Sequence, residues 1–193
     1  MTDINEHIRP ATAEIRPGDA PARSSAEADG PADAALLDLA ELLFFAYRDF
    51  IGEPDKILDE YGFGRAHHRV LHFVSRHPGL RVADLLEILK ITKQSLGRVL
   101  KQLIDDGFIA QEAGKTDRRE RLLFPTPRGR KLAERLAAPQ LQRISAALDA
   151  SGGRDKACIA DFLRAMASGE DRDRVESLAQ SAPGGRPAKA GPE

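Results

Sequence analysis

Cysteine is almost absent from this chain, and long apolar runs are missing altogether. The 193 residues include a single cysteine, Cys158, which excludes an intrachain disulfide and a multi-cysteine zinc site and fits a reducing compartment. No window approaches the ~18 consecutive apolar residues that a membrane-spanning helix needs. The N-terminal segment also has no apolar core of the kind found in signal peptides. We therefore expect a soluble, cytoplasmic protein without a membrane partner.

Motifs of enzyme chemistry are missing as well. The chain has no Gly-rich phosphate loop, no serine nucleophile in a strained turn and no paired-acid site. Hydrophobic residues make up 41% of the chain and charged residues 31%, a balance that suits one globular domain with tails. We expect no enzymatic activity and no cofactor.

Charge is unevenly distributed along the chain, although the formal net charge is only −1. Residues 1–60 hold five Lys or Arg against fourteen Asp or Glu, whereas residues 90–131 hold eleven against five. The basic excess of the second segment predicts a polyanionic partner such as nucleic acid. A solvated basic face without a partner is the alternative on charge alone.

The folded domain is expected in the middle of the chain, between tails without apolar periodicity. We predict an acidic, Pro-Ala-rich disordered arm over residues 1–31, a domain over residues 32–168 and a disordered tail over residues 169–193. The first helix, about 32–51, is apolar around so much of its circumference that we expect a second subunit to cover part of it. A separate short helix started by Pro54 and closed by a glycine should follow.

The segment about 62–126 has the pattern of a winged helix-turn-helix. After a helix that ends near Gly79, two short helices are predicted, the first over Val82–Leu89 and the second capped by Thr92 and ended by Gly107. Two short strands, 108–113 and 121–126, should then form a hairpin. The fold class is therefore mainly α with a small β wing.

Further helices are predicted over residues 127–168. The first should start at Thr126 as cap with Pro127 at its first position, and Pro139 should kink or break it. The last helix is expected to bury a stripe consisting of Ala157, Ile159, Phe162, Leu163 and Met166.

The second helix of the helix-turn-helix carries the residues suited to reading DNA. A turn of ~100° per residue puts Gln94, Arg98 and Lys101 opposite its apolar face. Gln and Arg make paired hydrogen bonds to adenine and guanine edges, whereas Lys93 and Lys101 suit phosphates. An ordinary amphipathic helix with a hydrated polar face is the alternative. The candidate DNA-contacting residues of this helix are Thr92, Lys93, Gln94, Ser95, Arg98 and Lys101.

These residues, together with the run "KTDRRERLLFPTPRGR", resemble the MarR family of bacterial transcriptional regulators. The matching features are Arg98 in the recognition helix, the Asp117-x-Arg119 pair of the wing and the Thr126-x-x-Gly129 helix start. The run "LLFFAYRDFIGEPDKILDEYGFGRAHHRVLHFV" is similar to a PetP-like subgroup of that family. Two prolines, at 125 and 139, depart from the family pattern.

The resemblance implies a winged helix-turn-helix domain flanked by dimerisation helices, about 32–51 and 127–168. It implies a homodimer that binds double-stranded DNA at a pseudo-palindromic operator, with an unidentified small-molecule effector. Arg119 would enter the minor groove, and Asp117 would hold its guanidinium in place. The candidate DNA-contacting residues of the wing are Lys115, Asp117, Arg118, Arg119 and Arg121. Whether the bound protein represses or activates is left open.

Two kinds of sensor residue are candidates. His68 and His72 share a helix face at a spacing that can hold zinc, but nearby arginines favour an interhelical hydrogen bond or a pocket for an anionic ligand. Cys158 is a candidate redox residue, although we expect it to be buried near the dimer contact and inert. The alternatives to a ligand-controlled DNA-binding regulator are a metal- or redox-sensing regulator and a winged-helix protein-interaction module without DNA binding.

Overall fold

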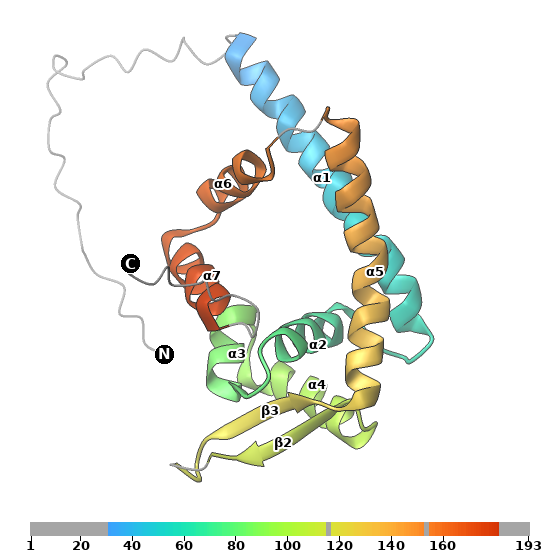
Figure 1. Cartoon of the computed structure of the whole chain (residues 1–193), viewed down its shortest axis with the longest axis vertical. Coiled ribbons are helices and arrows are strands. Elements are labelled where there is room, and N and C mark those ends of the chain that lie inside the picture. The colour runs from blue at the N-terminus through green and yellow to red at the C-terminus, as the bar shows by residue number, and fades with distance from the viewer. Residues whose placement is uncertain (1–30, 115–116, 153–154, 182–193) are drawn as a thin grey trace, which may run out of the picture. The chain divides into compact units, whose positions relative to one another are not determined.

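A computed structural model of the chain describes residues 31–114, 117–152 and 155–181. The described part is mainly helical with a small antiparallel sheet (Figure 1), as predicted. The chain divides into two compact units, residues 1–42 and 43–193, with the division inside the first helix. The elements are α1 (Pro31–Asp59), α2 (Arg65–Arg76), β1 (Leu80–Arg81), α3 (Val82–Leu89), α4 (Lys93–Asp105), β2 (Ile109–Ala113), β3 (Arg121–Pro125), α5 (Pro127–Ala150), α6 (Lys156–Met166) and α7 (Gly169–Ser181).

None of the described helices has the combination of length and apolarity that crossing a membrane requires.

The helix-turn-helix forms as predicted from local signals. The side-chain oxygen of Thr92 accepts a hydrogen bond from the backbone N–H of Ser95 at 3.1 Å, which satisfies one of the free donors at the start of α4. Past the end of α4, Gly107 takes the left-handed conformation with φ +73°. A side chain would be strained there, so glycine suits the abrupt end of the helix.

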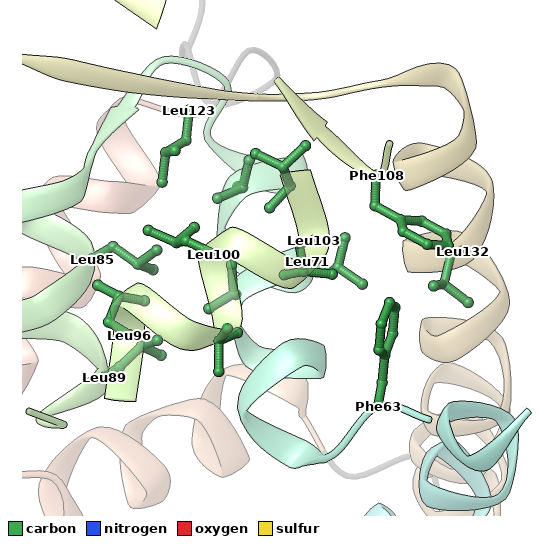
Figure 2. Close-up of a cluster of buried hydrophobic side chains, with 14 of the residues drawn as sticks. Phe63, Leu71, Leu85, Leu89, Leu96, Leu100, Leu103, Phe108, Leu123 and Leu132 are labelled. Carbon is green, nitrogen blue, oxygen red and sulfur yellow. The ribbon is translucent and has the colours of Figure 1, made fainter. Parts of the chain in front are cut away.

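The apolar half of α4 lies in the centre of the core. Leu96 and Leu100 lie beside Leu85 and Leu89 of α3, whereas Leu103 lies beside Leu71 of α2 (Figure 2). Toward α5, the core continues through three further residues whose side chains are also buried: Phe63, Phe108 and Leu132. Burial of this many large side chains is the main favourable term in the stability of the domain.

The sheet has three strands in the order β1-β3-β2, all antiparallel. The hairpin of β2 and β3 was predicted, and it pairs Ile109 with Pro125 and Ala113 with Arg121. Strand β1 was not predicted, because a two-residue strand is too short to show alternating polarity. Its residue Leu80 pairs with Leu123 and joins the helix-turn-helix to the wing.

Helix α5 starts at a tight junction with the wing. Thr126 caps the helix by accepting from the N–H of Gly129 at 3.0 Å. A Cβ atom at Gly129 would lie 2.0 Å from the carbonyl oxygen of Phe108, so only glycine allows the helix to approach the strand this closely. The predicted break at Pro139 is absent, since α5 continues to Ala150. Burial of Leu136 and Gln140 on either side of the proline favours the unbroken helix.

The separate helix predicted at Pro54 is wrong, because α1 runs unbroken through this residue. Proline has no N–H to donate to the carbonyl four residues earlier, which is that of Phe50. In the structure this carbonyl accepts a hydrogen bond from the side-chain amide of Gln140 at 3.3 Å. Gln140 lies in α5 and is only 9% exposed. The unpaired group that would end the helix is therefore satisfied by another helix.

The C-terminal part of the chain differs from two predictions. Helix α6 buries none of its residues within the chain, and the stripe expected to be buried is exposed. The disordered tail predicted from residue 169 instead begins with α7, where the hydroxyl of Ser168 accepts from the N–H of Asp171. Two ion pairs of 2.8 Å join α7 to Glu87 of α3 and to Lys90, the residue after α3: Arg174 with Glu87 and Asp171 with Lys90.

The other predicted domain limits stay predictions. The expected arm, except for Pro31, lies outside the described residues, and so do residues 182–193 of the expected tail.

Replacing Gln140 by alanine should lower the free energy of unfolding by about 1–3 kcal/mol, because the Phe50 carbonyl is left without a donor. In a Pro54→Ala background this carbonyl regains a helical N–H donor, so Gln140→Ala should lower the free energy of unfolding clearly less. Denaturant unfolding of all four proteins at one protein concentration measures the difference. Gln142→Ala, on the exposed side of the same helix, is the control. Equal costs in both backgrounds would show that the carbonyl does not depend on Gln140.

Candidate nucleic-acid interface

The polar face of α4 is exposed along its length. Thr92, the N-cap, is exposed, and so are the five candidate residues of the helix itself, Lys93, Gln94, Ser95, Arg98 and Lys101. Gly97 lies among them without a side chain and with open space around it, so a surface can approach the backbone closely. Lys101 pairs with Asp105 at 2.5 Å, and this hydrogen bond raises the pKa of Lys101. Lys101 therefore stays protonated at neutral pH, with Asp105 as its partner within the helix.

The wing presents three exposed arginines, Arg118, Arg119 and Arg121, where β2 and β3 run out beyond the helices (Figure 1). Arg121 donates from Nη1 to the carbonyl of Arg118 at 2.8 Å, which ties the strand to the tip. Gly114 is buried where the tip begins, and a Cβ there would lie 2.5 Å from the carbonyl oxygen of Asp117. Lys115, the remaining candidate of the wing, lies outside the described residues.

Asp117 acts on the backbone of the wing rather than on a guanidinium. Its carboxylate Oδ1 accepts a hydrogen bond from the backbone N–H of Arg119 at 2.8 Å. The carbonyl of Asp117 also accepts from the N–H of Glu120 at 3.1 Å. The expectation that Asp117 grips the Arg119 side chain therefore needs correction: the bond between them sets the course of the chain at Arg119.

The recognition helix and the wing meet at a shallow depression of about 440 Å³. Lys93, Gly97 and Lys101 of α4 border it on one side, and Gln111 and Arg121 of the hairpin border it on the other. Its floor is apolar, formed by Val82, Leu86, Leu96, Leu100 and Ile104. The structure thus brings candidate residues from both segments around one basic surface.

A second cavity, of about 310 Å³, lies between α1, α2 and α5. Its walls combine apolar and aromatic side chains with two arginines and the two candidate histidines. Arg65 is held there by Asp55 through bonds of 3.0 and 2.8 Å, and that bond raises the pKa of Arg65. The lining residues are Tyr47, Phe50, Ile51, Arg65, His68, Arg69, His72, Phe73 and Gln140.

Both candidate histidines are more weakly basic than usual. Loss of hydration among neighbouring atoms lowers the pKa of His68, and it lowers the pKa of His72 to about 4, with the positive charge of Arg76 adding to the effect. His72 nevertheless keeps an exposed edge. Both imidazoles are therefore neutral at pH 7. In the described part of the chain, no group of three or more His, Cys, Asp or Glu side chains is arranged to hold a metal ion.

Cys158 is exposed on α6 within the single chain, and its burial near a dimer contact stays a prediction. The neighbouring apolar residues of α6 are exposed too, among them Phe162 at 56% and Leu163 at 55%. The helix itself was predicted correctly, and within the single chain its apolar stripe is uncovered.

Sequence reasoning missed Gln140 of the second cavity, and it included Arg69 only among the arginines near His68 and His72, without a role of its own. Arg69 donates from Nη2 to the carbonyl of Leu89 at 3.0 Å, across to the end of α3. Arg69 lies one residue after His68 and three before His72, so their shared helix was the only signal that could have pointed to it.

Residues 61–120 match the sequence model of the MarR family. The chain is 48% identical over 134 residues to the HTH-type transcriptional regulator PetP of Rhodobacter capsulatus, covering 69% of this chain and 81% of the relative. It is 32% identical over 108 residues to an HTH-type transcriptional repressor of Mycobacterium bovis, covering 53% and 76%.

Among solved structures, the fold is similar to that of a MarR protein from Peptoclostridium difficile. The TM-score is 0.57 at 19% sequence identity, and the match covers 80% of this chain and 99% of the other. This similarity supports the same overall arrangement of helices and hairpin.

Replacing Asp117 separates a backbone role from a charge role. Asp117→Asn keeps a side-chain oxygen that can accept from the Arg119 N–H, whereas Asp117→Ala removes it. We expect hydrogen exchange at the Arg119 amide to become several-fold faster in the alanine variant, because a lost hydrogen bond favours local opening. The asparagine variant should stay close to the wild type. Faster exchange in both variants would mean that the negative charge, and not the acceptor, orders the tip.

Proposed function

The chain belongs to the MarR family and is a DNA-binding transcriptional regulator, and we propose that it acts as a homodimer on a pseudo-palindromic operator. Each protomer would insert α4 into a major groove and place its wing at the neighbouring minor groove. The resemblance first seen in the recognition helix and the wing agrees with the family match and with the 48% identity to PetP.

The observation that carries the proposal is the two-sided character of α4. Its apolar side is buried, while Gln94, Arg98 and Lys101 are exposed on the other side with no part of the described chain covering them. We propose that Gln94 and Arg98 read base edges, with Lys93 and Lys101 at phosphates and Thr92 and Ser95 where the helix approaches the backbone of the DNA.

We propose that Arg119 enters the minor groove and that Asp117 supports it by fixing the backbone beside it. A narrow, A/T-rich minor groove has an enhanced negative potential that attracts arginine. Arg118, Arg121 and Lys115 would add contacts to phosphates. The backbone bond of Asp117 favours this role because it limits the directions in which the Arg119 side chain can leave the tip.

We propose that a second copy of the chain covers the exposed apolar faces. MarR-family regulators act as dimers, and this chain exposes large apolar residues on α1, such as Phe44 at 72% and Leu36 at 63%. Leu141 of α5 and Phe162 of α6 are exposed to a similar degree. Exposed apolar surface of this extent is costly in water and is typical of subunit interfaces.

We further propose that the cavity between α1, α2 and α5 binds a small anionic ligand with an apolar body. Its aromatic and aliphatic walls suit the body, and its arginines suit a carboxylate. The two neutral histidines add polar groups without positive charge. Occupancy of this cavity would change DNA binding by favouring one arrangement of the dimer over another.

Selection of bound duplexes from a random pool by the full-length protein tests the DNA proposal. We expect an inverted repeat whose half-sites are separated by one helical turn, ~10 bp, or a multiple of it. Arg98→Ala should weaken binding to the selected duplex by ~1–3 kcal/mol and relax the sequence preference. Arg119→Ala should weaken binding chiefly where the flanks are A/T-rich. Fluorescence anisotropy at fixed salt measures both effects.

Arg76→Ala is the matched control, because it removes an exposed arginine from α2 and not from α4 or the wing. Its affinity for the selected duplex should equal that of the wild type. If no duplex were retained at low salt while light scattering confirmed a dimer, the protein-interaction module would be the better description.

Benzoate and its neutral analogue benzamide test the ligand proposal. Benzoate should raise the melting temperature of the protein and weaken its binding to the selected duplex, because a ligand that binds the folded state stabilises it. Benzamide should do neither at the same concentration, since it has no charge for the arginines. Ile51→Trp, which fills part of the cavity, should abolish the response. Equal responses to both compounds would contradict the anion preference.

A further inference from the structure

Arg69 connects the ligand cavity to the helix-turn-helix. The residue borders the cavity between α1, α2 and α5, and its Nη2 donates to the carbonyl oxygen of Leu89 at 3.0 Å. Leu89 is the last residue of α3, and only three residues separate it from the first residue of α4. Arg69 therefore contacts both the ligand cavity and the end of α3.

The carbonyl that Arg69 binds is one that α3 cannot satisfy by itself. The last carbonyls of a helix have no partner within the helix, and that of Leu89 obtains one from Arg69. The next residue, Lys90, has φ 50° although it is not glycine. A non-glycine residue in this conformation is strained and persists only when its surroundings hold it there. The turn that sets the direction of α4 thus depends on outside contacts.

We infer that Arg69 is a positioning residue that holds this turn, and that an anion in the cavity draws its guanidinium away from Leu89. The inference rests on the proposed ligand-controlled DNA binding, and it adds Arg69 as the residue that links the cavity to the helix-turn-helix. A bound carboxylate and the Leu89 carbonyl compete for the position of the same guanidinium, so occupancy of the cavity loosens the α3–α4 turn and weakens DNA binding.

Competition favours the anion because the present partner of Arg69 is a neutral carbonyl. Its bond to the carbonyl has a charged donor only, whereas a carboxylate adds a full negative charge and can accept two parallel N–H bonds from one guanidinium. Arg65 is different, since it already has two bonds to the Asp55 carboxylate. Of the two cavity arginines, Arg69 is therefore the one that gains most from a ligand's negative charge.

A carboxylate built into the cavity tests the inference without knowledge of the natural ligand. His72 lies three residues after Arg69 on the same helix, so the two side chains are neighbours. His72→Glu supplies a fixed anion beside Arg69, and His72→Gln supplies a neutral side chain of the same size. We expect His72→Glu to bind the selected duplex about tenfold more weakly than His72→Gln, as expected for loss of one hydrogen bond from a charged group.

Arg69→Gln should weaken binding by a similar factor, and adding His72→Glu to it should weaken binding no further. The dependence of affinity on salt should be the same in all variants, because Arg69 makes no phosphate contact and none is lost. Hydrogen exchange at the Lys90 amide should be faster in His72→Glu and Arg69→Gln than in His72→Gln. Arg172→Gln, which removes an exposed arginine of α7 that does not line the cavity, is the control and should match the wild type.

The outcomes separate the inference from the proposed function. If His72→Glu and His72→Gln bound DNA alike and exchanged the Lys90 amide alike, the inference would be overturned while DNA binding stood. The same conclusion would follow if His72→Glu weakened binding equally with and without Arg69. If the wild type bound no duplex, the proposed function would fail, and the exchange rates would still decide whether Arg69 holds the turn. Circular dichroism verifies that each variant is folded.

Discussion

Burial of one side of α4 is the constraint on which the rest of the structure depends. Leu96 and Leu103 are at most 1% exposed, and they fix the rotation of the helix about its axis. Because an α-helix turns ~100° per residue, fixing these residues forces Arg98 and Lys101 to the opposite side. The charged surface is thus a consequence of the core: turning it inward would bury charges without partners.

A second constraint joins the end of α4, the wing and α5 at one place. The hydroxyl of Thr126 donates to the carbonyl of Gly107 at 2.7 Å, and its backbone N–H donates to the carbonyl of Phe108 at 3.1 Å. Gly129 packs against the same Phe108 carbonyl. Since no side chain separates these segments, a displacement of α5 carries the wing and the end of the recognition helix with it. Contacts at this point therefore join the long helix α5 to both parts of the proposed DNA-binding surface.

Signals confined to a few neighbouring residues were read correctly from the sequence, and contacts between distant residues were not. The caps at Thr92 and Thr126 act within three residues, so both helix starts could be predicted. The continuity of α1 through Pro54 depends on Gln140, which no local pattern reveals. The exposed face of α4 could be predicted from helical spacing. The role of Asp117 could not, because it depends on whether its carboxylate accepts a hydrogen bond from the backbone or from the side chain of Arg119.

Helix α2 explains how a change at the cavity could reach α4 without disturbing the core. Its residues Val70 and Leu71 are fully buried, so the helix cannot shift far. The polar side of α2 makes a second hydrogen bond to the helix-turn-helix, in addition to the bond from Arg69 to the Leu89 carbonyl. The N–H of Gly64 donates to Nδ1 of His67 at 3.1 Å, which leaves Nε2 to donate to the side-chain oxygen of Gln102 at 3.0 Å. Gln102 lies at the border between the buried and exposed sides of α4. Side chains of α2 therefore contact the α3–α4 turn through Arg69 and the C-terminal half of α4 through His67, so the loss of one such contact can act on α4 while the core stays in place.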